Sequence, residues 1–161
     1  MRSSQGASAA LAAVVMALVL SGCGAGGSPT TTSPGVTCSG TGHSVEVVVE
    51  LGDHHVVDRC VAFSGAKIAG ETAMTRSRIE FASQHFSFGD AICQIDRDPT
   101  SYTDCLGSGQ PYWALFIWSG GRWKAASTGI SQVTLSSGQA LGWRYDGSQG
   151  TAPPPPRPPK R

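Results

Sequence analysis

The sequence predicts an α+β domain in which one helix packs among several strands. Segments rich in β-branched and aromatic residues stand before and after a single helix-like segment. Glycine is abundant, at 21 of 161 residues, which favours a turn-rich β protein over a helical bundle. Only 14% of the residues are charged, and the apolar ones alternate with polar ones in short runs. These observations indicate a small sheet with a covered face.

The first 22 residues have the composition of a bacterial secretory signal. One arginine precedes an apolar run over residues 9–20, and small residues follow the run. A helix of this length rises about 18 Å, against roughly 30 Å for a bilayer core, so we do not expect it to span a membrane. Leu20-Ser21-Gly22-Cys23 then resembles the lipobox of bacterial lipoprotein precursors. An ordinary cleaved signal peptide is the alternative.

The lipobox resemblance implies a location for the protein. Cleavage before Cys23 and attachment of acyl chains to its thiol would anchor the protein at the extracytoplasmic face of the cell membrane. Its partner there would be the membrane itself, through the lipid.

The remaining four cysteines predict two disulfides. Outside the cytoplasm, an even number of thiols indicates pairing, and four cysteines allow three connectivities. We favour Cys93–Cys105 across a turn-rich loop, with Cys38–Cys60 as the second bond. Zinc is not expected, because no C-x₂₋₄-C spacing occurs.

Changes in composition divide the chain into four parts. Residues 1–22 are the signal peptide, and residues 23–37 are a Gly/Ser/Thr/Pro-rich tether. The folded domain is expected over residues 38–146. Residues 147–161 form a Pro-rich basic tail, expected to be polyproline II or disordered.

The first half of the domain predicts a hairpin followed by the helix. Residues 43–51 alternate between apolar and polar side chains, as in a half-buried strand. Gly52 marks a turn, and residues 54–61 return as the second strand. Ser64 is a candidate cap for a helix over about residues 65–77.

The second half predicts further strands around a long polar loop at residues 96–110. Residues 112–118 are the most apolar stretch of the domain and are expected to form a central strand. The other expected strands lie at about residues 78–86 (unless this is the descent from the helix), 91–95, 122–125, 131–135 and 140–145.

An aromatic set in this half is the best candidate for a binding surface. The 112–118 strand is apolar on both faces, so either both faces are covered or one of them binds a ligand or partner. The alternative is core packing, since a small sheet needs large aromatic side chains. The candidate ligand-binding residues are Tyr112, Trp113, Trp118, Trp123 and Trp143.

Other functional classes lack support in the sequence. A formal net charge of +1 provides no basic field for nucleic acid. No G-x-S-x-G motif occurs and the cysteines are expected to be oxidised, so we expect neither an enzyme nor catalytic residues. Adjacent His54 and His55 would point to opposite faces of a strand. The acidic residues around the expected Cys93–Cys105 bond do not match the spacing of a calcium loop and are expected to be solvated; they are Asp90, Asp96, Asp98 and Asp104. No metal or cofactor is therefore expected.

Three motifs nevertheless resemble a known family. They are F-x-F-G-x-A-x-C-x-I-D at residues 86–96, Y-W-x-x-x-x-W-x-G-G-x-W at 112–123, and S-G-x-x-x-G-W at 137–143. Together they resemble small secreted actinobacterial proteins related to the domain of unknown function 4430, which is similar to the C-terminal domain of transcobalamin. The resemblance implies a β-grasp-like fold, in which a curved mixed sheet cradles one helix. It also raises a cofactor-like ligand such as a corrinoid, although Ala114-Leu115 replaces the Ser-Tyr of the family pattern.

The sequence therefore suggests a lipid-anchored domain that binds a small molecule or an envelope protein. The alternative is an envelope interaction or structural protein with no small ligand, whose aromatic residues all lie in the core.

Overall fold

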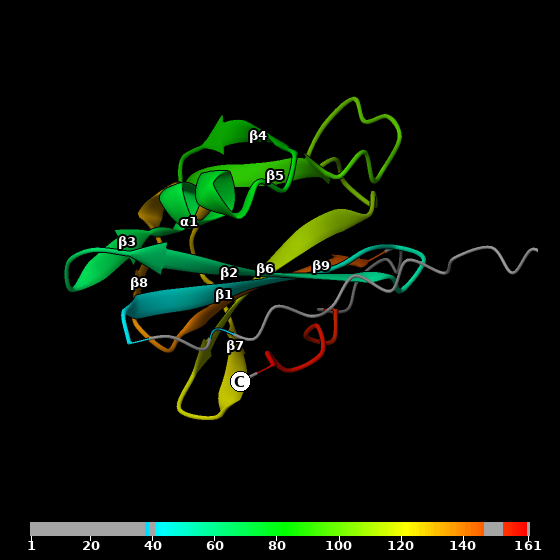
Figure 1. The fold of residues 1–161 in the computed structure, drawn as a ribbon. Helices are drawn as coiled ribbons and strands as arrows, with labels where there is room; N and C mark the ends of the chain where they lie inside the picture. The colour runs from blue at the N-terminus through cyan, green and yellow to red at the C-terminus, as the bar shows by residue number, and fades with distance from the viewer. Residues whose placement is uncertain (1–37, 39–40, 147–152, 161) are drawn as a thin grey trace, which may run out of the picture. The chain divides into compact units, whose positions relative to one another are not determined.

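The computed structural model describes residues 38, 41–146 and 153–160, within the compact unit formed by residues 33–161 (Figure 1). The expected signal peptide, Cys23 and the tether lie outside the described residues. Across the part of the chain that is described, no helix combines the length and the hydropathy needed to cross a membrane.

A five-stranded mixed sheet forms the base of the fold. Its strand order is β2-β1-β9-β6-β7. The strands are β1 (His43–Glu50), β2 (Val56–Phe63), β6 (Tyr112–Ser119), β7 (Arg122–Ala125) and β9 (Ala140–Asp146). β1 and β9 run parallel, whereas the other neighbours are antiparallel. The predicted β1–β2 hairpin and the interior position of the 112–118 strand are confirmed.

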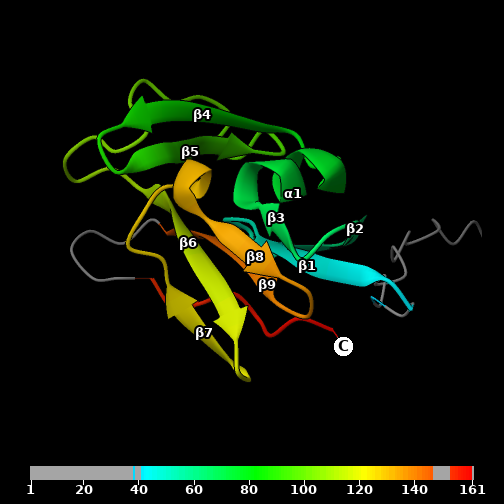
Figure 2. The same ribbon diagram turned by 90° about the vertical axis from the view of Figure 1, so that its left-hand side faces the viewer.

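A second layer covers one face of the sheet, called here the inner face (Figures 1 and 2). Within the described residues it holds the single α-helix, α1 (Gly70–Ser77), two short strand pairs and a 3₁₀ turn, η1 (Ile130–Gln132). The strand pairs are β3 (Lys67–Ala69) with β8 (Thr134–Ser136), and β4 (Phe81–Phe86) with β5 (Gly89–Ile95). A mixed sheet with one packed helix confirms the α+β class.

Alternation along the strands places the core between these layers. Val45, Val47 and Val49 are all at most 1% exposed, and they pack with Leu141 and Trp143. Because side chains on a strand point alternately to opposite faces, Glu46 and Glu50 belong to the other face, called here the outer face.

The helix begins later than the sequence predicted. Residues 67–69 pair with β8 instead of continuing the helix, so α1 starts at Gly70 and Ser64 does not cap it. The Gly70 N–H donates to the Val133 carbonyl at 2.9 Å. A Cβ on Gly70 would lie 2.9 Å from the Ile130 carbonyl oxygen, so the helix start depends on close packing against η1. The helix propensity of the residues around Gly70 gives no information about that contact.

The strand expected at residues 131–135 is also shorter than predicted. Ile130–Gln132 forms η1, and the strand β8 covers only Thr134–Ser136. Its partner β3 has just three residues, which limits the length of the ladder.

Both favoured disulfides are present. Cys38 and Cys60 have Cα atoms 5.3 Å apart, and the Cα atoms of Cys93 and Cys105 are 4.4 Å apart. The second bond ties the 96–110 loop to β5, as the sequence suggested.

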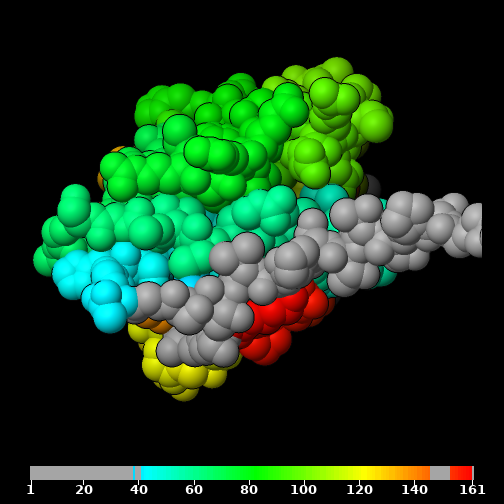
Figure 3. Space-filling model, viewed as in Figure 1, coloured from blue at the N-terminus to red at the C-terminus, as the bar shows by residue number. Residues whose placement is uncertain are grey.

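The sequence predicts a C-terminal tail that is either polyproline II or disordered, and its described part, residues 153–160, follows an ordered path. Residues 153–160 lie against the outer face of the sheet, and Pro156 is fully buried there. In Figure 3 the red atoms of this segment lie on the side of the molecule opposite the green second layer. The physical reason is a set of side-chain contacts, described below, that offsets the entropy lost on ordering the segment.

Candidate functional site: an apolar cavity beside β6

The candidate site is an apolar cavity of about 290 Å³ between β5, η1 and the first half of β6. Three of the five aromatic candidates, Tyr112, Trp113 and Trp143, line it. The other lining residues are Phe88, Asp90, Ala91, Ile92, Leu106, Ala114, Leu115, Phe116, Ala125, Ala126, Thr128, Gly129, Ile130 and Pro153.

The cavity exists because β7 is short. β7 pairs only with Phe116–Ser119, and one further hydrogen bond joins the Ala126 N–H to the Leu115 carbonyl at 2.8 Å. Alternate residues of an antiparallel strand direct their backbone polar groups to the same edge, so those of Trp113 point the same way as those of Leu115. No described strand pairs with β6 on that edge before Leu115, which leaves room for a ligand beside it.

A close contact between two backbones forms one wall. The Gly129 N–H donates to the Phe88 carbonyl at 2.8 Å. A Cβ on Gly129 would lie 2.5 Å from the Asp90 nitrogen, so only glycine allows this approach. The segment before η1 is thereby held against the start of β5.

Asp90 is the charged residue among those that line the cavity. Its carboxylate accepts a hydrogen bond from His85 Nδ1 at 2.5 Å, and its N–H donates to Ser131 Oγ at 2.9 Å. Glu71, in the first turn of α1, also hydrogen-bonds to the Asp90 carboxylate. The side chain is thus oriented from β4 and α1, while η1 holds the backbone of Asp90.

These contacts shift the pKa values of Asp90 and Glu71 in opposite directions. The hydrogen bond from His85 lowers the pKa of Asp90 below its ordinary value, and the bond with Glu71 lowers it further. The hydrogen bond to Asp90 is the main cause that raises the pKa of Glu71, with burial second. Asp90 therefore carries the negative charge while Glu71 is the group that holds a proton longer as the pH rises. The sequence placed Asp90 among solvated loop carboxylates, and its spacing reveals neither neighbour.

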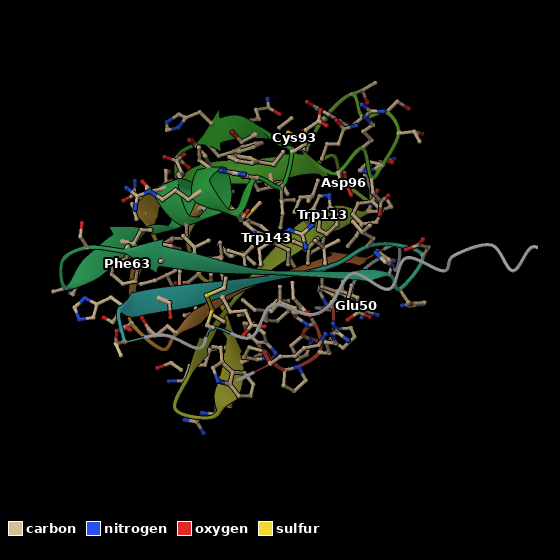
Figure 4. All side chains as sticks on the ribbon, in the orientation of Figure 1. Glu50, Phe63, Cys93, Asp96, Trp113 and Trp143 are labelled. Carbon is tan, nitrogen blue, oxygen red and sulfur yellow. A yellow bond between two sulfur atoms is a disulfide. The ribbon has the colours of Figure 1, made fainter. Side chains whose placement is uncertain are left out.

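The aromatic candidates do not form one surface. Trp113 and Trp143 are 5% and 1% exposed and lie between the sheet and the second layer (Figure 4). Trp113 Nε1 donates to the Asp98 carbonyl at 3.0 Å, and its ring lies 5.1 Å from that of Tyr145. Their role is both core packing and lining of the cavity, so the two interpretations of the sequence meet in the same residues.

Trp118 and Trp123 occupy the outer face instead. Their positions on β6 and β7 are paired across the strands, and their rings meet edge to face at 5.3 Å. The aromatic set is therefore split between the two faces of the sheet.

The polar loop residues have structural partners. Asp98 Oδ2 accepts the Gly52 N–H at 2.7 Å, and Asp104 Oδ1 accepts the Leu106 N–H at 3.1 Å. His54 and His55 lie in the loop between β1 and β2, where His54 Nδ1 is 3.5 Å from Glu50 Oε1. Within the described ranges, no group of three or more His, Cys, Asp or Glu side chains has the geometry to hold a metal ion.

Comparison with known proteins does not assign the chain to a family. No family model and no curated protein matches the chain. One similar solved structure is a protein from Ruminococcus gnavus ATCC 29149 described as a "putative metal binding protein". It is 18% identical with a TM-score of 0.48, and the match covers 68% of this chain and 99% of that chain.

Proposed function

We propose that this protein is a lipid-anchored extracytoplasmic binding domain, without enzymatic activity, that takes a small and mainly apolar molecule into the cavity beside β6. The observation that carries the proposal is the pairing of an aromatic-lined cavity with one oriented carboxylate, Asp90. Apolar walls with a few placed polar groups are typical of small-molecule sites. Aromatic walls would hold an apolar ring, and Asp90 would accept a hydrogen bond from a donor or cation on it.

The dimensions limit the ligand. A volume of about 290 Å³ lies at the lower end of the roughly 300–1,000 Å³ usual for ligand pockets. A compact ring system fits inside, whereas a corrinoid would insert only an edge or a side chain. A β-grasp-like arrangement, as in the family that the motifs resemble, is part of the same proposal.

A thermal-shift screen tests the cavity. The probes are aromatic amines, nitrogen heterocycles and corrinoids, each at several concentrations. A specific ligand at about 100 times its Kd stabilises the folded state by about 2.7 kcal/mol, which is measurable as a rise in Tm. Ala126→Trp should abolish that rise, because the indole would fill the cavity that Ala126 lines.

The matched control is Ala62→Trp, at an exposed position of the edge strand β2 and outside the cavity. It should keep the rise in Tm. If no probe stabilises the protein, or if Ala126→Trp responds like the parent, the cavity proposal is wrong and the alternative of an envelope protein without a small ligand is favoured.

The anchor needs a test of its own. Cys23→Ala should leave an unprocessed precursor or release the protein into the medium, as fractionation and immunoblotting would show. Unchanged membrane association of a processed Cys23→Ala protein would contradict lipid anchoring.

A further inference from the structure

Burial along the C-terminal segment repeats every three residues. Pro153 and Pro156 are buried and Pro159 is half-buried, whereas the prolines between them are exposed. A polyproline II helix has three residues per turn, so one of its edges presents every third residue. The pattern is that of a polyproline II helix laid edgewise on the sheet.

The surface beneath this edge is shaped for proline. Gly142 lies under Pro156, and a Cβ at that position would stand 2.9 Å from Pro156 Cγ. The same Cβ would lie 2.6 Å from the Trp123 ring, which itself meets Trp118 edge to face. Aromatic-lined grooves are the usual receptors for polyproline II segments.

A second edge of the segment carries its charge. Arg157 and Lys160 are also three residues apart, and both reach Asp58 on β2. Arg157 Nη2 lies 2.5 Å from Asp58 Oδ2, and Lys160 Nζ lies 3.2 Å from the same oxygen. The Asp58 side chain is only 3% exposed, so it needs these cations as long as the segment covers it.

Two further carboxylates bind the backbone of the segment. The Arg157 N–H donates to Glu50 Oε2 at 3.3 Å, and the Lys160 N–H donates to Glu46 Oε1 at 2.9 Å. Figure 4 shows Glu50 on the side of the sheet opposite Trp113 and Trp143. Three carboxylates on β1 and β2 thus bind successive parts of residues 153–160.

These contacts resemble a receptor with its ligand more than an added layer of the sheet. Residues 153–160 contain no strand and pair with none. The outer face contacts three separate features of the segment. They are the proline at every third position, the two cations at the same interval, and the backbone N–H groups that donate hydrogen bonds. Polyproline II leaves its backbone polar groups unpaired internally, so a row of acceptors can bind them.

We propose that the outer face is a docking site for a proline-rich basic segment of a partner protein, and that residues 153–160 occupy it as a built-in competitor. The partner segment carries prolines three residues apart and two cations at the same interval. This proposal concerns the outer face and does not rest on a ligand in the cavity beside β6, although Pro153 of the segment also lines that cavity.

The covalent connection sets the strength of the competition. A ligand joined covalently to its own site by a short linker has an effective concentration of about the millimolar range. A free segment of equal intrinsic affinity therefore competes poorly until the built-in segment is released. Cutting the connection should uncover the site.

The experiment uses the whole chain with a protease recognition sequence inserted between Asp146 and Pro153. The protein is folded first, then cut, and the released segment is removed by gel filtration. Binding of a dye-labelled peptide with the sequence of residues 153–161 is measured by fluorescence anisotropy. We expect the cut protein to bind at least tenfold more tightly than the uncut protein, with a change in tryptophan emission.

Variants on both sides of the contact sharpen the test. A peptide with Arg157→Ala and Lys160→Ala should bind the cut protein at least tenfold more weakly, and so should the parent peptide against Asp58→Asn. The peptide variant cannot disturb folding of the domain. A peptide with Pro154→Ala, at an exposed position, is the matched control and should bind like the parent.

Three results would overturn the proposal. One is a cut protein that retains its fold but binds no peptide, and another is equal binding by cut and uncut protein. The third is a concentration-dependent dimer of the uncut chain that Asp58→Asn abolishes, because the face would then take the tail of a second copy.

Discussion

Gly142 lies between Trp123 and Pro156, and a Cβ at this position would stand 2.6 Å from the indole ring and 2.9 Å from the proline Cγ. One missing side chain thus lets a strand of the sheet, an aromatic ring and the C-terminal segment meet. The contact joins β9 to residues that follow it in the chain and to β7, two strands away in the sheet order.

Gly142→Ala should therefore destabilise the protein and displace the C-terminal segment. Overpacking of a buried site costs about 1–3 kcal/mol. Thermal unfolding measures the loss, and acrylamide quenching of tryptophan fluorescence should increase. Gly42→Ala is the control, since a Cβ there meets nothing within 4 Å. Equal unfolding curves for Gly142→Ala and the parent would show that the Trp123 ring and Pro156 can move aside without lowering the free energy of unfolding.

Trp113→Phe should loosen the 96–110 loop while largely preserving the core. The exchange keeps an aromatic ring but removes the Nε1–H that donates to the Asp98 carbonyl. A hydrogen bond of this kind contributes about 0.5–1.5 kcal/mol. Hydrogen exchange should speed up in the loop, with a small drop in Tm.

Tyr102→Phe serves as the comparison for that prediction. Tyr102 lies in the same loop and is 43% exposed, so its loss of a hydroxyl should leave exchange unchanged. Slow exchange preserved in Trp113→Phe would show that this hydrogen bond does not hold the loop, which the Cys93–Cys105 bond and the Asp98–Gly52 hydrogen bond also tie to the domain.

Removal of the Cys93–Cys105 bond should weaken both stability and the cavity. Opening a loop with a sequence separation of 12 costs roughly 3 kcal/mol in the chain-entropy model. Leu106 follows Cys105 and lines the cavity, so a Cys93→Ser/Cys105→Ser protein should also lose the thermal shift given by any cavity ligand.

The other disulfide separates these two effects. Cys38→Ser/Cys60→Ser should cost a similar free energy of unfolding, because its sequence separation is 22, but neither residue lines the cavity. Ligand shifts that disappear equally in both double variants would indicate general loosening and not loss of one wall.

Glu71→Gln should stabilise the protein near neutral pH. The raised pKa of Glu71 in the folded state favours its protonated form, so its contribution is fully present below the unfolded value of about 4.5 and is lost as the pH rises through the folded pKa. Glutamine keeps a donor toward Asp90 without a charge. The gain over the parent should therefore appear as the pH rises above about 4.5 and vanish in acid.

Asp90 behaves in the opposite sense. Its lowered pKa means that its contribution is present above the unfolded value of 3.8 and is lost as the pH falls through the folded pKa. Urea denaturation from pH 3 to pH 7 separates the pH dependence due to Glu71 from that due to Asp90. Glu80→Gln is the control, since Glu80 is 66% exposed and only loosely paired with Arg97 at 3.8 Å. A stability gain for Glu71→Gln that is the same at every pH would contradict the assigned protonation.

Much of the fold could be predicted because strands leave a local record. Val45, Val47 and Val49 alternate with Glu46, Val48 and Glu50, and the structure buries the first three against the second layer. The apolar 112–118 run lies inside the sheet, and both favoured cysteine pairs are bonded. The start of the helix could not be predicted, since it depends on pairing of residues 67–69 with a strand far along the chain.

The candidate site was predicted only in part. Tyr112, Trp113 and Trp143 were identified from their type and strand position, and they line the cavity. Asp90 was not assigned to it, because the residues that orient its carboxylate come from α1 and β4. Residues that come together from separate elements have no fixed spacing in the sequence by which they could be found.

By itself the sequence determined the apolar side of the alternating strands and where the chain turns, and it favoured one of three cysteine connectivities. Only the tertiary structure decided what covers each face. Glu46 and Glu50 alternate with valines as residues of a solvated face would, yet residues 153–160 lie over them. The physical reason is that alternation records the polarity of a strand face, whereas its cover depends on a segment more than 100 residues away in the chain.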